Sequence, residues 1–94
     1  MVQMLNIGGE FFVAEKKIIA IYPYKSHMAK AMVKDADESG YLSDCTGRRK
    51  TLSVILLSGE GGREIFLSPI APKTLTKRLC PGIDNNEPEQ PNLD

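Results

Sequence analysis

The sequence contains one histidine, His27, and two cysteines, Cys45 and Cys80. A lone histidine cannot form a metal site, and next to a predicted helix start its ordinary role is an exposed side chain. Cys45 has no base close to it in the sequence that would activate it, so we expect a buried thiol. The sequence therefore predicts no enzyme activity, no metal and no cofactor.

Long apolar runs are also absent. No stretch approaches the roughly 18 residues that a membrane-spanning helix needs, and the first residues lack the charged-then-apolar pattern of a secretory signal. We therefore expect a cytoplasmic protein with reduced cysteines. The glycine-rich stretches "NIGGE" and "GEGGR" have no helix predicted directly after them, so they favour hairpin turns over phosphate-binding loops.

The last fifteen residues, 80–94, contain no lysine or arginine but hold three prolines, three asparagines and four acids. Such a composition cannot bury enough apolar surface to offset the entropy of ordering, so we expect a flexible acidic tail. Residues 1–79 then form a single domain. They carry all 12 cations but only eight of the 12 acids, a net charge of +4 that permits a polyanionic partner.

The pattern of the first 79 residues predicts an α+β domain with a mostly antiparallel sheet. Ser26 is a plausible N-cap for a main helix whose apolar residues recur at helical spacing, and Gly40 is a plausible C-terminal stop. Pro23 ends the third strand. The expected elements are a hairpin over 2–14, a strand over 18–22, a helix over 26–39, a hairpin of 51–58 and 63–68, and a short helix over 72–79.

Two predicted strands, 18–22 and 54–57, are apolar on both faces. Two helices, one of them short, would cover only one face of the sheet, and the other face would then expose an unusually large apolar patch. Burial against copies of the same chain removes this difficulty, so we expect a homo-oligomer. The alternative is a sheet whose second face is covered by loops.

Three consecutive cations, Arg48, Arg49 and Lys50, follow Gly47 and precede an apolar strand. Arginine presents a planar fork of donors that matches two oxygens of a phosphate, or the edge of a guanine. Lys16 and Lys17 form a second basic group before another strand, and the two groups would make one basic rim if their turns lay side by side. The alternative is a solvated turn whose charges serve solubility.

Three segments resemble the bacterial extracellular-matrix regulatory family of the RemA/RemB type: "LNIGGEFFVAEKKIIAI", "DCTGRRKTLSVIL" and "IFLSPIAPKTLTKRL". The resemblance covers roughly residues 4–79, and its motifs occur in the family's order. It implies a transcriptional regulator of matrix and biofilm genes that binds double-stranded DNA. It also implies that small α+β protomers assemble into rings, with the DNA following a basic rim.

The resemblance places the family's DNA-contacting residues on Lys17, Arg48 and Arg49, and adjacency adds Lys50. Lys17 stands where the RemA type has arginine, and the element between Asp44 and Gly47 is one residue shorter than the RemA pattern. The first hairpin and "SPIAPKTLTKR" look more like the RemB type, which leaves the subtype open. A second hypothesis is an oligomeric interaction or scaffold module. A third, an enzyme acting on small acidic metabolites, has no catalytic residues to support it.

Overall fold

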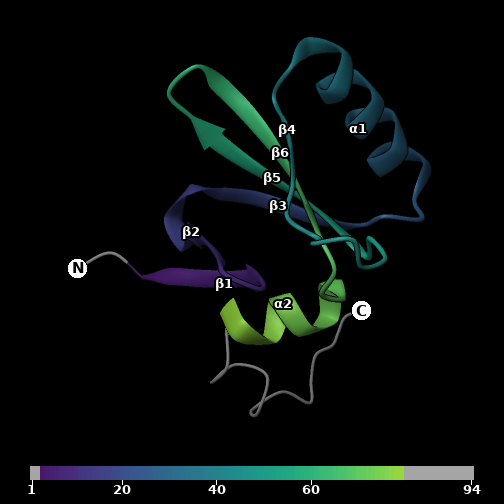
Figure 1. The fold of residues 1–94 in the computed structure, drawn as a ribbon. Helices are drawn as coiled ribbons and strands as arrows, with labels where there is room; N and C mark the ends of the chain where they lie inside the picture. The colour runs from purple at the N-terminus through teal and green to yellow at the C-terminus, as the bar shows by residue number, and fades with distance from the viewer. Residues whose placement is uncertain (1–2, 80–94) are drawn as a thin grey trace, which may run out of the picture.

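The structure, a computed structural model, describes residues 3–79 (Figure 1). The predicted tail, residues 80–94, lies outside the described residues. The elements in chain order are β1 (Met4–Gly8), β2 (Phe11–Ala14), the 3₁₀ turn η1 (Glu15–Lys17), β3 (Ile18–Pro23), α1 (His27–Ser39), β4 (Leu42–Asp44), β5 (Ser53–Gly59), β6 (Gly62–Ser68) and α2 (Pro72–Leu79). This order confirms the predicted α+β class with two hairpins, a main helix and a short C-terminal helix.

The main helix α1 begins and ends where its capping residues predict. The Oγ of Ser26 accepts a hydrogen bond of 3.1 Å from the backbone N–H of Ala29, which satisfies a donor in the first turn. Gly40 ends the helix in the left-handed conformation, with φ of 83°, and its N–H bonds back to the last turn. Ala29 and Ala36 are buried on the face that packs against the sheet.

The strands form two sheets instead of one. Strands β1 and β2 pair only with each other, while the larger sheet has the order β3-β5-β6-β4. Strand β4 is an addition that the sequence pattern did not predict, and it runs parallel to β6. The larger sheet is therefore mixed, with antiparallel pairing in the central β3-β5-β6 part.

The prediction that the two helices share one face of the sheet is wrong. Helix α1 packs with Val54, Leu56, Ile65 and Leu67 on one face. Helix α2 and the β1–β2 hairpin pack against Ile55 and Leu57 on the other, and Figure 1 shows the two helices on opposite sides of the sheet. A β-strand points successive side chains to opposite faces, so the apolar run of β5 serves both layers within one chain.

This packing removes the reason that the sequence offered for self-association, because the chain itself covers both faces. The large apolar side chains that remain exposed within residues 3–79 are Met4, Phe11, Phe12, Ile19, Met28 and Leu52, each 37% to 59% exposed. The described residues also include no helix long and apolar enough to cross a membrane.

Candidate functional site

The chain makes a compact turn from the last residue of β4 toward β5, residues 44–50, which we call the arginine turn. The Oδ1 of Asp44 accepts hydrogen bonds from the backbone N–H of Thr46 at 2.9 Å and from its Oγ at 2.6 Å. Thr46 is 3% exposed, which is unusual for a polar residue in a turn. The Asp44 carboxylate and the buried threonine therefore fix the base of the turn.

The tip of the arginine turn has strained backbone geometry. Gly47 and Arg48 both have positive φ, 62° and 75°, and Arg48 is the one residue other than glycine with positive φ in residues 3–79. The N–H of Arg49 donates to the carbonyl of Thr46 at 3.1 Å, which closes a turn of the I′ kind. The left-handed conformation costs about 1–2 kcal/mol at a residue with a Cβ.

The cationic side chains of the turn extend into solvent without acidic partners. Arg48, Arg49 and Lys50 are all exposed. Within residues 3–79 none of them forms an ion pair, and the only side-chain hydrogen bond is from the Nε of Arg49 to the carbonyl of Thr46, at 3.4 Å. The Asp44 carboxylate accepts its hydrogen bonds from Thr46 and forms no ion pair with these cations. The guanidinium groups therefore remain available to an external anion.

The hydrogen bonds from the Thr46 side chain and backbone lower the pKa of Asp44 below its ordinary value. A carboxyl whose pKa is lower in the folded state contributes stability above its unfolded pKa and loses it as the pH falls through the folded pKa. At neutral pH Asp44 is therefore ionised, and its hydrogen bonds from Thr46 make their full contribution to the stability of the turn.

We expect the substitution Asp44→Ala to weaken anion binding at the turn by roughly two- to tenfold, because it removes the hydrogen bonds that hold Thr46. The direction of the change in affinity is informative, because the loss of a negative charge alone would strengthen binding to a polyanion. Asp44→Asn is the matched control: it removes the same charge but keeps the Oδ1 acceptor. Duplex affinity at fixed salt measures both, and tighter binding by Asp44→Ala would contradict the anchoring role.

Lys17 does not lie beside the arginine turn within one chain. In the antiparallel pair of β3 and β5, Ile18 is opposite Leu57 and Pro23 is opposite Ser53. The five residue steps from Ile18 to Pro23 span about 17 Å at about 3.4 Å per residue. Lys17 precedes one end of this pair, and residues 48–50 precede Ser53 at the other end. The predicted site residues form two separate groups in the protomer.

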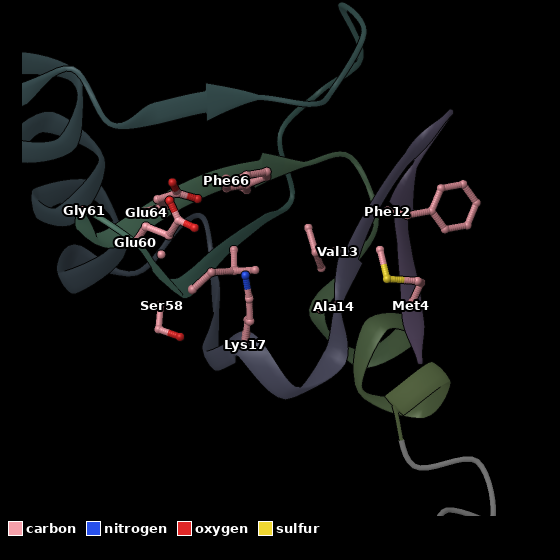
Figure 2. A pocket seen from close by; sticks show the side chains of 12 residues that line it. Met4, Phe12, Val13, Ala14, Lys17, Ser58, Glu60, Gly61, Glu64 and Phe66 are labelled. Carbon is pink, nitrogen blue, oxygen red and sulfur yellow. The ribbon is translucent and has the colours of Figure 1, made fainter. Parts of the chain in front are cut away.

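Lys17 lines an open hollow of about 600 Å³ between the β1–β2 hairpin and the turn of β5 and β6. Figure 2 shows it between Met4 and Phe12 on one side and Glu60 and Glu64 on the other. Lys17 thus shares this space, which we call the Lys17 hollow, with two carboxylates. In the arginine turn, residues 44–50, the one carboxylate is that of Asp44, and it accepts its hydrogen bonds from Thr46.

The structure places Lys25 close to the arginine turn, although Lys25 belongs to no basic group in the sequence. Lys25 and Lys50 line the same small hollow, because the N–H of Tyr24 donates to the carbonyl of Leu52 at 3.0 Å. The signal that could have identified Lys25 is the antiparallel pairing of β3 with β5. This pairing brings the residues that follow β3 close to those that precede β5, and so brings Lys25 close to Lys50.

The residues with possible catalytic chemistry remain apart from one another. His27 is exposed, and Cys45 is buried, with a pKa raised first by burial and then by the charge of Asp44. Within residues 3–79 no group of histidine, cysteine and acidic side chains could hold a metal ion. Cys80 lies outside the described residues.

Comparison with known proteins supports the family resemblance seen in the sequence. The family model described as "RemA-like: Extracellular matrix regulatory protein A-like" matches residues 4–79. A protein of Geobacillus kaustophilus (strain HTA426) is 34% identical, with 93% of this chain and 97% of the relative aligned. One of Thermosynechococcus vestitus is 37% identical, with 83% and 97% aligned. Both carry the name "putative regulatory protein".

Proposed function

This chain belongs to the RemA-like family of extracellular matrix regulatory proteins, and we propose that it is a DNA-binding transcriptional regulator that acts in the cytoplasm as a ring-like homo-oligomer. The observation that carries the proposal is the arginine turn. Its backbone is strained at Arg48, its base is held by Asp44 and Thr46, and its guanidinium groups have no acidic partner within residues 3–79. Strain of this kind is retained where a side chain must project in a fixed direction.

DNA phosphates are the partner that suits these side chains. Each guanidinium can donate two parallel hydrogen bonds to a phosphate, and each contact releases condensed counterions from the duplex. Few contacts per protomer give weak, salt-sensitive binding. A ring repeats them, and each bound protomer raises the effective concentration of the next. Sequence preference then comes largely from the bendability of the DNA and the phasing of its repeats.

Lys17 is the second proposed DNA contact. Since it lies at the other end of the β3–β5 pair, it contacts different phosphates from those bound by residues 48–50. Its contribution to affinity is therefore expected to add to theirs, and to be smaller because Glu60 and Glu64 line the same hollow. The exposed apolar residues that remain, Met4 and Phe12 among them, provide surface for contacts between protomers.

The second candidate function is an oligomeric interaction or scaffold module without direct DNA contact. The Lys17 hollow favours it, because apolar side chains and mixed charges are typical of protein interfaces. Salt titration separates the two functions. Loss of affinity with rising salt indicates counterion release, whereas a flat response indicates apolar contacts.

The experiment that tests the proposal is the native molar mass measured by light scattering, with and without a DNA duplex. We expect an oligomer in the sample without DNA and a heavier complex in the sample with duplex. The average mass of the second sample should fall as salt is raised, because the complex dissociates. A monomer in both samples would remove the repeated contacts on which the proposed affinity depends. An oligomer that leaves the duplex unbound at low salt would support the scaffold function.

A further inference from the structure

Three loops meet beside the arginine turn and enclose an apolar hollow of about 230 Å³, which we call the Lys25 hollow. The loop after β3 is tied to the loop before β5 by the 3.0 Å bond from Tyr24 to Leu52. The N–H of Leu52 donates in turn to the carbonyl of Ser68 at 2.9 Å, which attaches both loops to the end of β6. The lining residues are Pro23, Tyr24, Lys25, Lys50, Thr51, Leu52, Ala71 and Pro72.

The charge of this hollow is entirely positive. Lys25 and Lys50 are the charged residues that line it, and no carboxylate does so among the described residues. The Lys17 hollow differs, because two glutamates accompany its lysine. Of the two hollows, the Lys25 hollow is therefore complementary to a polyanion, and it adjoins the arginines through Lys50.

The hollow also has an apolar wall, which includes Leu52 and Tyr24. Leu52 is 37% exposed and directly precedes the buried strand β5. The Nζ of Lys30 lies 5.9 Å from the centre of the Tyr24 ring, within the range of a cation–π contact. A deoxyribose ring has the size and the partly apolar character to pack against Leu52 and Tyr24 while the flanking phosphates approach the two lysines.

We infer that Lys25 and Lys50 bind the backbone of double-stranded DNA across this hollow, so that Lys25 is a further DNA-binding residue. The inference rests on the proposed function and extends its contact surface from the arginine turn to the loop between β3 and α1. Lysine suits this role because its ammonium group is a point charge on a flexible stem, able to follow the phosphates of different sequences.

The test compares Lys25→Ala with Lys34→Ala, an exposed position on α1 away from the hollow, so that both variants lose one positive charge. Binding of a fluorescein-labelled duplex is measured by anisotropy between about 50 and 200 mM salt. We expect Lys25→Ala to raise the Kd by roughly tenfold and to reduce the salt slope by about 1 for each phosphate that is no longer neutralised. Lys25→Arg is expected to keep both near the parent values.

Equal effects of Lys25→Ala and Lys34→Ala would overturn the inference, since only the net charge would then matter. This failure is distinguishable from failure of the proposed function. If alanine at Arg48 and Arg49 abolishes binding while Lys25→Ala matches its control, the protein binds DNA but not across this hollow. If the arginine variant binds as well as the parent, the proposed function itself fails.

Discussion

Replacing Arg48 and Arg49 together by alanine is expected to weaken duplex binding by roughly 100-fold or more at fixed salt. Both guanidinium groups are exposed and lack acidic partners within residues 3–79. Hydrogen bonds to charged groups contribute about 1.5–3 kcal/mol each, and every tenfold change in affinity corresponds to about 1.4 kcal/mol. Gel shift at a fixed salt concentration, made on variants confirmed to be intact oligomers, measures the loss.

Two controls keep this prediction specific. The pair Lys34→Ala with Arg63→Ala removes the same charge from exposed positions on α1 and β6 and is expected to cost far less affinity. Arg48→Gly removes the guanidinium but relieves the positive φ, so its thermal midpoint should equal or exceed that of the parent while its DNA affinity falls. Unchanged affinity in the double arginine variant would refute the DNA-binding assignment.

The substitution Leu75→Ala is expected to lower the free energy of unfolding by about 2–5 kcal/mol. Leu75 is fully buried, and it packs from α2 into the core layer that contains Leu5, Ile7 and Ile55. A domain of this size has a total stability of only about 4–12 kcal/mol. A loss of this size should lower the thermal midpoint by about 10 °C or more. Thermal unfolding at one fixed protein concentration measures it, because self-association adds to apparent stability.

Thr74 provides the matched control, since it precedes Leu75 in α2 and is exposed. Thr74→Ala is expected to change stability by less than about 0.5 kcal/mol. If Leu75→Ala were equally mild, α2 would not pack on the sheet face opposite α1. That face would then be open for self-association, as the sequence pattern suggests.

The helices were predictable because their signals lie within a few residues of each other. Ser26 and Gly40 bracket α1 by local capping contacts, and Pro72 opens α2 at the predicted residue. Strand β4 was missed because its three residues, "LSD", show no useful alternation. It is a strand only because β6 supplies hydrogen-bonding partners from more than twenty residues away in the chain.

The candidate site was predicted in part. The exposed arginines follow from their sequence and from the family resemblance, yet their DNA contacts stay a prediction. The anchoring by Asp44 and Thr46 was not foreseen, although an aspartate two residues before a threonine is a common turn signal. Lys25 was missed because its neighbour Lys50 is far from it in the sequence and close to it only across the β3–β5 pair.

By itself the sequence determined the class of fold, the family, the two helices and the charge of the arginine turn, because each depends on local periodicity, capping or motif order. The tertiary structure alone decided that the helices cover opposite faces of the sheet. It also separated Lys17 from the arginine turn and joined Lys25 to it. The reason is physical: strand pairing and layer packing bring together residues from distant parts of the chain, and no local pattern specifies which ends meet.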